Sequence, residues 1–297
     1  MSTIEKALQK QREKNQQESA EQAQAETQDT AQASSSPAAS ATQETQPREQ
    51  PAPAPAAPKA LITIDQQELR EKGLITDSTE RQKIKDEFRY IKRKLLNNAF
   101  GQAAQNLENG NLVMVSSGKP NEGKTFISIN LALSIALEQD KTVLLIDADV
   151  IRPSISAELN ISPRKGLVEY LLGEVPNVSE VIYNTSISNL KIIPAGEPHH
   201  LTSELLASDK MRQLTQELAN RYSDRMVIFD SPPLIEVNES QVLANLMGQA
   251  LVVVEESQSK IADIQKAVDS LDEDLAIGFV INKAVQTQKD MYGYYGY

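Results

Sequence analysis

Cysteine and tryptophan are absent from the 297 residues, and aromatic residues make up only 4% of the chain. A chain without cysteine forms neither a disulfide framework nor a thiolate zinc site. The only histidines, His199 and His200, do not make a metal site on their own. Long apolar runs are also missing: none approaches the roughly 18 residues that span a bilayer, and the N-terminus lacks the apolar core of a signal peptide. We therefore expect a soluble, cytoplasmic protein.

Positive charge is in deficit, with 30 basic against 41 acidic residues and a net charge of −11. Proteins that bind nucleic acid rely on lysine and arginine to displace counterions from phosphates. We therefore expect no nucleic-acid partner.

Large apolar side chains are missing from a long N-terminal segment. Between Gln9 and Ala60 there is no Val, Ile, Leu, Met, Phe or Tyr, so this stretch cannot bury enough surface to offset its chain entropy. Residues 1–14 have the pattern of a short helix, which either docks on a partner or frays. Residues 15–60 are predicted to be a disordered linker rich in Gln, Ala and Pro. The remainder predicts one folded domain over residues 61–285 and a short tail over 286–297.

A basic, amphipathic helix is predicted over residues 79–100. Its apolar stripe has helical spacing and consists of Ile84, Phe88, Ile91 and Leu95. Among the charged residues around the stripe, lysine and arginine outnumber aspartate and glutamate. This basic face is either a solvated surface or a contact surface for an acidic neighbour or anionic lipid, and the pattern leaves both interpretations open.

From Asn111 onward, short apolar runs alternate with amphipathic stretches. The apolar runs predict strands over 112–116, 142–147, 190–194, 225–230, 250–255 and 277–282. The amphipathic stretches predict helices over 124–139, 166–172, 202–222, 239–247 and 259–271. Strands that are apolar throughout and separated by helices indicate a parallel sheet covered on both faces. The expected fold class is α/β, with a doubly wound, mostly parallel sheet.

A glycine-rich motif lies between the first predicted strand and the first helix that follows it. Residues 118–125 read GKPNEGKT and fit G-x-x-x-x-G-K-[ST] at every fixed position. Loop amides and the positive helix end cradle phosphates in such a motif, its lysine reaches the terminal phosphates, and its threonine ligates Mg²⁺. The alternative is a glycine turn that precedes a helix by chance. It does not explain why a strand, the loop and a helix occur in the required order, so we expect a P-loop NTPase. Its predicted ATP-binding residues are Gly118, Lys119, Pro120, Asn121, Glu122, Gly123, Lys124, Thr125 and Phe126.

Three aspartates lie at the ends of two predicted strands. Asp147 and Asp149 follow one strand, and Asp230 ends another. Each alone fits an aspartate that caps a turn, but the carboxyl ends of parallel strands face the ligand crevice, and three acids beside a P-loop favour a site. We assign Lys124 to charge stabilisation and Thr125, Asp149 and Asp230 to Mg²⁺. Asp147 then accepts or orients the proton of an incoming hydroxyl, which makes Lys124, Asp147 and Asp149 the predicted catalytic residues, although the order of Asp147 and Asp149 stays open.

The nucleotide base has one candidate contact. Asn282 and Lys283 follow the last predicted strand and either contact the base or form an ordinary turn. The segment reads NKAV and lacks the aspartate of a guanine-reading N-K-x-D motif, so we expect ATP rather than GTP.

Four segments together resemble the bacterial tyrosine kinases of exopolysaccharide and capsule synthesis. They are SSGKPNEGKTFISINLA, VLLIDADVIRPS, VIFDSPPL and the terminal MYGYYGY, and the resemblance covers roughly residues 75–297. MSTIEKAL, DADVIRPS and DSPPLIEVNESQVLANLMGQALVVVEE are most similar to cytoplasmic autokinases of exosortase-linked (PEP-CTERM) exopolysaccharide loci. The resemblance implies ATP- and Mg²⁺-dependent autophosphorylation in trans on a tyrosine-rich tail. It also implies regulation of polysaccharide polymerisation or export.

Four of the eight tyrosines lie in the last six residues: Tyr292, Tyr294, Tyr295 and Tyr297. Glycines between them favour a segment that can enter a neighbouring active site, and each phosphate adds roughly −2 charge. The alternative is a Tyr/Gly-rich tail without function. Because the chain also has a predicted ATP site, we favour the interpretation that the tail is a phosphorylation substrate.

The resemblance also implies assembly and partners. Kinases of this family carry an E-x-x-R-x-x-R helix that docks on the adjacent subunit of a ring, and the corresponding residues here are Asp86, Arg89 and Lys92. Lysine lacks the planar fork of arginine, so the sequence predicts a ring less firmly than ATP binding. A separate transmembrane polysaccharide co-polymerase activates such kinases and holds them at the inner membrane, and a tyrosine phosphatase is the expected counterpart.

One residue supports a rival function. Lys119 occupies the place where MinD/ParA-type ATPases carry a second lysine that crosses a dimer interface. That function is an ATP-dependent dimerisation switch, with water as the nucleophile. Alternatively, Lys119 is a loop lysine near the phosphates that makes no contact with a partner subunit. An inactive scaffold conflicts with the intact lysine and the three acids.

Overall fold

The computed structural model describes residues 61–78, 82–200, 202–221 and 224–285. The predicted N-terminal helix, the predicted linker and the tyrosine-rich tail lie outside these residues. In the part that is described, no helix has the length and apolar character needed to cross a membrane.

The described strands form one seven-stranded sheet in the order β3-β4-β2-β5-β1-β6-β7. Their bounds are β1 Leu112–Ser117, β2 Thr142–Asp147, β3 Tyr183–Asn184, β4 Leu190–Ile193, β5 Arg225–Asp230, β6 Gln249–Glu255 and β7 Ala276–Asn282. Every neighbouring pair is parallel except β3 and β4. The predicted class, a mostly parallel α/β sheet, is confirmed.

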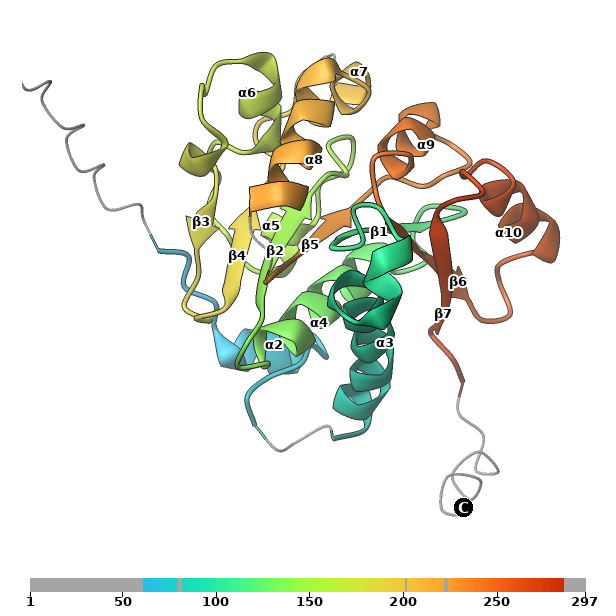
Figure 1. Ribbon diagram of the computed structural model, residues 1–297. Coiled ribbons are helices and arrows are strands. Elements are labelled where there is room, and N and C mark those ends of the chain that lie inside the picture. The colour runs from blue at the N-terminus through green and yellow to red at the C-terminus, as the bar shows by residue number, and fades with distance from the viewer. Residues whose placement is uncertain (1–60, 79–81, 201, 222–223, 286–297) are drawn as a thin grey trace, which may run out of the picture. The chain divides into compact units, whose positions relative to one another are not determined.

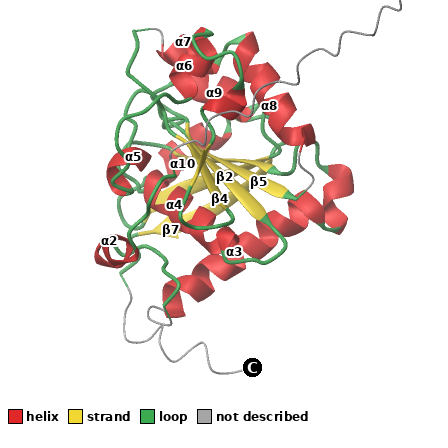
Figure 2. Ribbon diagram, turned by 90° about the vertical axis from the view of Figure 1, so that its left-hand side faces the viewer, coloured by secondary structure: helices red, strands yellow, loops and turns green. Residues whose placement is uncertain are grey.

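Helices cover both faces of this sheet (Figures 1 and 2). The α-helices are α2 Gln66–Glu71, α3 Gln82–Phe100, α4 Lys124–Ala136, α5 Ile155–Glu158, α6 Leu167–Leu172, α7 Thr202–Leu206, α8 Asp209–Arg221, α9 Asn238–Ala244 and α10 Ile261–Val268. Two short 3₁₀ helices are η1 Gln102–Asn106 and η2 Val178–Glu180. The order of elements from β1 to β7 follows the predicted alternation of strands and helices, except for α5, η2 and β3, where no element was predicted.

The sheet separates two apolar cores because successive strand side chains point to opposite faces. Leu112 and Met114 of β1 belong to the core under α6, α8, α9 and α10. Val113 and Val115 of the same strand belong to the core under α2, α3, α4 and α5. Both sets are fully buried, which explains why the strand sequences are apolar at every position.

Several predicted helices differ in extent from the observed ones: α10, for example, covers Ile261–Val268 rather than 259–271. For two of the predicted helices the contacts give the reason. α4 ends at Ala136 rather than Gln139, and the amide of Asn189 donates to the carbonyls of Ala136 and Glu138 at this end. The helix predicted over 202–222 is divided into α7 and α8. At the break, the Ser208 hydroxyl accepts a hydrogen bond from the Met211 amide, which is the geometry of a new helix cap.

A segment before α3 also packs on the sheet, although no element was predicted there. The Ile62 amide donates to the Asn184 carbonyl, and the Ser186 amide donates to the Ile62 carbonyl. Leu69 of α2 and Leu74 just after it are 1% and 2% exposed. α2 has only six residues, too few for its apolar spacing to stand out in the sequence.

Candidate active site

The predicted phosphate motif and strand-end acids meet at one edge of the sheet. β5 lies between β1 and β2, so the loop after β1 starts beside the end of β5 and one strand away from the end of β2. Asp147 and Asp230 are register partners on neighbouring strands. Parallel strands therefore bring these carboxylates to the phosphate loop, as predicted from their positions after the strands.

The loop between β1 and α4 has a backbone that requires glycine at one position. Gly123 has φ 98° and directly precedes α4. A Cβ at this position would lie 2.0 Å from Nδ2 of Asn282. Glycine is therefore needed both for the left-handed conformation and for the close approach of β7.

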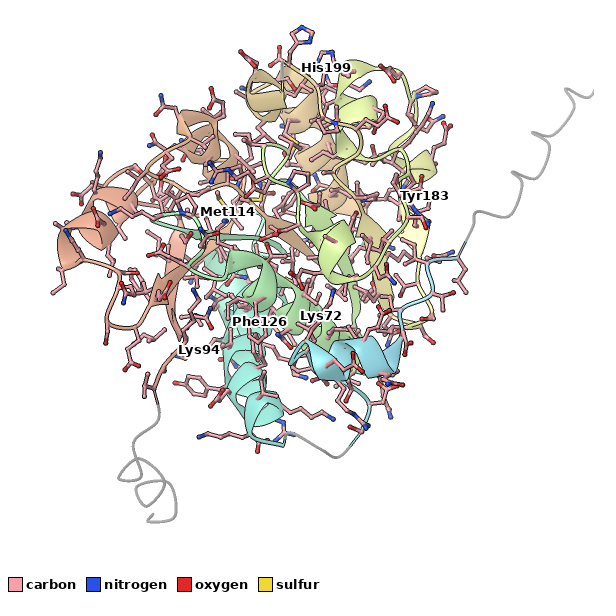
Figure 3. All side chains as sticks on the ribbon, turned by 180° about the vertical axis from the view of Figure 1, so that it is seen from behind. Lys72, Lys94, Met114, Phe126, Tyr183 and His199 are labelled. Atoms are coloured by element: carbon pink, nitrogen blue, oxygen red, sulfur yellow. The ribbon has the colours of Figure 1, made fainter. Side chains whose placement is uncertain are left out.

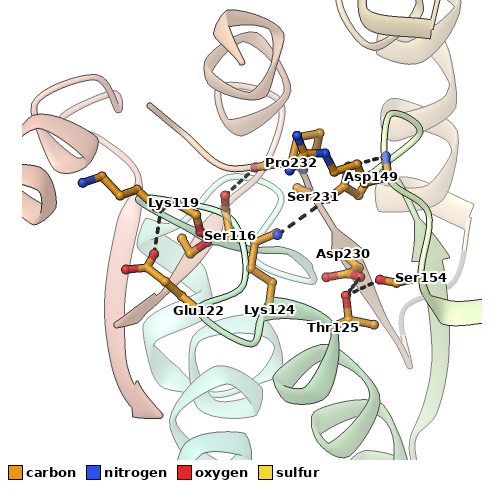
Figure 4. A network of polar contacts seen from close by, with 12 residues as sticks. Ser116, Lys119, Glu122, Lys124, Thr125, Asp149, Ser154, Asp230, Ser231 and Pro232 are labelled. Atoms are coloured by element: carbon orange, nitrogen blue, oxygen red, sulfur yellow. Dashed lines mark hydrogen bonds and ion pairs between the residues drawn. The ribbon is translucent and has the colours of Figure 1, made fainter. Parts of the chain in front are cut away.

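Lys124 extends toward Asp149 from the first turn of α4. Its Nζ lies 3.6 Å from Oδ2 of Asp149, and both side chains are buried (Figure 4). The Arg152 amide donates to Oδ1 of the same carboxylate at 3.1 Å. Burial raises the pKa of Asp149, and the Lys124 ammonium opposes that rise.

Asp230 accepts hydrogen bonds from two hydroxyls of α4. Thr125 Oγ1 donates to Oδ2 at 2.7 Å, and Ser128 Oγ donates to Oδ1 at 2.9 Å. Ser154 Oγ lies 2.6 Å from Thr125 Oγ1 and extends the network (Figure 4). Desolvation of the fully buried carboxyl raises the pKa of Asp230 to about 6, although both hydroxyl hydrogen bonds lower it.

Asp147 is fully buried, like Asp230 and unlike Asp149, which is 5% exposed. Its Oδ2 accepts the Ile155 amide at 3.1 Å, whereas Oδ1 has no hydrogen-bond partner among the described residues. Burial, followed by the charge of Asp230, holds the pKa of Asp147 well above its usual range. An unpaired buried oxygen needs a specific explanation, and a catalytic role is one such explanation.

A cavity of about 850 Å³ opens over this edge of the sheet. Predicted site residues that line it are Pro120, Asn121, Gly123, Lys124, Thr125, Phe126 and Asp149. Sequence reasoning missed other lining residues, including Lys72, Leu74, Ile151, Arg152, Ser154 and Glu236. Lys72 directly follows α2 and lines the cavity together with Phe126 of α4 (Figure 3). The α2 segment thus contributes to a wall of the cavity.

The donors at this site fit a magnesium ion that is held together with phosphates. Thr125, Asp149 and Asp230 supply only oxygen atoms, which Mg²⁺ prefers. Within the described ranges, no group of three or more His, Cys, Asp or Glu side chains could hold a metal. Mg²⁺ commonly keeps several waters and binds through one or two carboxylates plus substrate phosphates, so such a cage is not needed.

Three predicted site residues near the loop make contacts within the chain. Lys119 Nζ lies 2.7 Å from Oδ2 of Asp263 in α10. The Asn282 side-chain amide donates to the Glu122 carbonyl at 2.9 Å, and Lys283 Nζ donates to the Asn121 carbonyl at 2.7 Å. Neither Asn282 nor Lys283 lines the cavity described above, and the base contact of Asn282 stays a prediction.

The predicted oligomer residues on α3 differ in their surroundings. Arg89 donates to Asp86 at 2.6 Å, and both side chains are about half exposed. Lys92 is buried, donates to the Ser134 carbonyl at 2.8 Å and pairs with Glu138. Arg89 and Asp86 therefore present a polar surface, whereas the Lys92 ammonium already has partners on α4 and in the turn after it.

Comparisons with known proteins agree with this architecture. The AAA domain family matches residues 110–274, more than half of the chain. The tyrosine-protein kinase YwqD of Bacillus subtilis is 31% identical over 186 residues, which cover 62% of this chain and 77% of YwqD. The solved kinase domain of Escherichia coli ETK is 32% identical, with a TM-score of 0.55 over 63% of this chain and 72% of that domain.

Some relatives are much longer than the matched region. The tyrosine-protein kinase etk of Escherichia coli K12 is 32% identical over 186 residues, but the match spans only 25% of its length. The corresponding share for the tyrosine-protein kinase ptk of Acinetobacter johnsonii is 23%. The match to YwqD covers most of that relative, and the family match covers most of the strands and helices described above. The chain therefore belongs to the bacterial tyrosine-protein kinase family of AAA-domain proteins.

Proposed function

We propose that this protein is a protein-tyrosine autokinase that transfers the γ-phosphate of ATP to its C-terminal tyrosines in trans. The observation that carries the proposal is the convergence of Lys124, Asp149 and Asp230 beside the cavity, in a chain that ends in MYGYYGY. Tyr292, Tyr294, Tyr295 and Tyr297 are the proposed acceptors.

The phosphate loop and the three strand-end aspartates each have a proposed part in this transfer. The loop amides and Lys124 hold the phosphates of ATP and stabilise the charge that develops on them. Thr125, Asp149 and Asp230 hold Mg²⁺, which neutralises phosphate charge when bound. Asp147 accepts or orients the proton of the incoming phenol, and its raised pKa makes it a better base than an ordinary carboxylate.

The proposed setting is the regulation of exopolysaccharide polymerisation or export. One relative is named for a cps region in Klebsiella pneumoniae. We propose that the chain acts in the cytoplasm at the inner membrane, held there by a transmembrane co-polymerase that activates it. We further propose that it assembles into a ring through α3 and that a tyrosine phosphatase reverses its modification.

A dimerisation ATPase remains the alternative function. The Lys119 ammonium, which would cross the dimer interface, pairs with Asp263 of its own chain. The pair is exposed, so a partner subunit can compete for this lysine at little cost.

Incubation of the purified full chain with γ-labelled ATP, followed by mapping of the label, tests the kinase. We expect label on tyrosines 292–297, lost in Lys124→Met and in a variant with all four tail tyrosines changed to Phe. Lys266→Met, an exposed lysine of α10, is the matched control and should label normally. Release of free phosphate without labelled protein would identify an ATPase and contradict the kinase.

A further inference from the structure

A carboxylate within a phosphate-binding loop is unexpected because it would repel the phosphates. Glu122 is such a residue, but its side chain does not line the cavity and is only 7% exposed. Its Oε2 accepts the Lys119 backbone amide at 2.8 Å (Figure 4). Its Oε1 accepts the hydroxyl of Ser259, outside the loop. Both oxygens therefore have donors within the protein.

Ser259 is itself fixed at the end of β6. The Glu255 amide donates to Ser259 Oγ at 2.9 Å, and the Ser259 amide donates to the Glu255 carbonyl at 3.1 Å. A serine hydroxyl has one hydrogen to donate, and this one goes to Glu122. The carboxylate thus connects the amide at the start of the loop to the turn that leads into α10.

Further contacts tie the same side of the loop to the end of β7. Asn282 donates to the Glu122 carbonyl and Lys283 to the Asn121 carbonyl, at 2.9 and 2.7 Å. These bonds restrain the loop backbone through its carbonyls. The Glu122 side chain alone holds the Lys119 amide and the hydroxyl of Ser259 together.

We propose that Glu122 is a positioning residue that sets the nucleotide-binding shape of the loop by bridging the Lys119 amide and Ser259. The inference rests on the proposed binding of ATP at this loop. Hydrogen bonds to a carboxylate are short and strong, so the bridge fixes the loop before the nucleotide arrives. It also turns the negative charge of Glu122 away from the phosphates.

The test compares Glu122→Ala, Glu122→Gln, Ser259→Ala and the double variant Glu122→Ala/Ser259→Ala in the full chain. We expect Glu122→Ala to weaken binding of a fluorescent ATP analogue by about tenfold, because the Lys119 amide loses its acceptor.

Glu122→Gln should bind the analogue within about threefold of the unchanged chain, because its side-chain oxygen still accepts the Lys119 amide and its NH₂ can donate to Ser259. The two alanine changes should be less than additive, because they break one shared bond. Glu273→Ala, an exposed acid beyond α10, removes the same charge without contacting the loop and should bind normally.

A second measurement does not require nucleotide. Hydrogen exchange at the Lys119 amide should accelerate in Glu122→Ala and remain slow in Glu122→Gln and Glu273→Ala. Equal loss of affinity in the Ala and Gln variants, additive effects of Glu122→Ala and Ser259→Ala, or unchanged exchange at Lys119 would each overturn the proposal. If the unchanged chain bound no ATP, the proposed function would fail, and the exchange measurement would still decide the role of Glu122. If Glu122→Ala failed to fold, Glu122→Gln and Ser259→Ala would still test the bridge by affinity and by exchange.

Discussion

Asp230 illustrates how the site keeps a fully buried carboxylate available for a cation. Its two oxygens accept hydrogen bonds from Thr125 and Ser128, which lie one helical turn apart on α4. Thr125 was predicted from the phosphate motif, whereas Ser128 was not. The available signal was the three-residue spacing of the two hydroxyls, which places them on the same helix face.

We predict that Ser128→Ala lowers the free energy of unfolding by about 1–2 kcal/mol in the nucleotide-free protein. The change leaves one oxygen of a buried carboxylate without its donor, and hydrogen bonds to charged groups are worth about that much. Ser134→Ala is the matched control, since Ser134 is another buried serine of α4 and is 3% exposed. Denaturant unfolding of both variants measures the difference. Equal stability of the two would mean that the Ser128 bond contributes nothing.

The helix α3 combines an exposed polar surface with buried anchors. Its apolar stripe was predicted, and Phe88 and Leu95 of that stripe are 3% and 7% exposed. Lys92 was predicted as an interface residue from the spacing of a motif. Spacing on a helix cannot tell whether a lysine stem is covered by a neighbouring helix, because that depends on how α3 crosses α4.

Arg89→Ala and Lys92→Ala should therefore have different effects. We expect Lys92→Ala to destabilise the fold by about 2 kcal/mol, because it leaves the Ser134 carbonyl and Glu138 without their donor. We expect Arg89→Ala to change stability by less than about 0.5 kcal/mol, because its pair with Asp86 is exposed. If α3 forms the proposed ring contact, Arg89→Ala should also reduce the assembly size. Thermal unfolding of the two variants checks the stability changes, and light scattering checks the assembly size. A Lys92→Ala variant as stable as the unchanged chain would contradict the contact with α4.

Elements with a strong pattern were predictable, and elements fixed by tertiary contacts were not. β2 and β5 have the predicted bounds, because each is a short apolar run that ends in aspartate. β3 has only two residues, and its antiparallel pairing depends on contact with β4, so no local sequence pattern marks it as a strand. For the same reason the strand-end acids were predictable as a group, whereas the Glu122–Ser259 contact was not. It joins residues 137 positions apart, and no local pattern specifies such a pair.

The extent of the folded unit follows from the packing of residues 61–75. The sequence predicts that the domain begins at residue 61, because large apolar side chains return there. The Ile75 amide donates to the Asn130 side chain of α4 at 2.8 Å, and Lys72 donates to the Glu158 carbonyl at 2.6 Å. These contacts join the segment to the helices beside the cavity. It is therefore part of the fold that supports the site, although it precedes the residues matched by the AAA domain family.

Two truncations test this boundary. A chain that begins at Leu61 should unfold within a few degrees of the full chain, because residues 9–60 offer no large apolar side chain to a core. A chain that begins at Thr79 loses Ile62, Leu69, Leu74 and Ile75, all at most 2% exposed. At about 1.5–3 kcal/mol for each buried side chain, that loss rivals the total stability of a typical domain. We therefore expect the shorter chain to be unfolded or to lose cooperative unfolding, as measured by circular dichroism. Cooperative unfolding at an unchanged temperature would instead place residues 61–78 outside the folded unit.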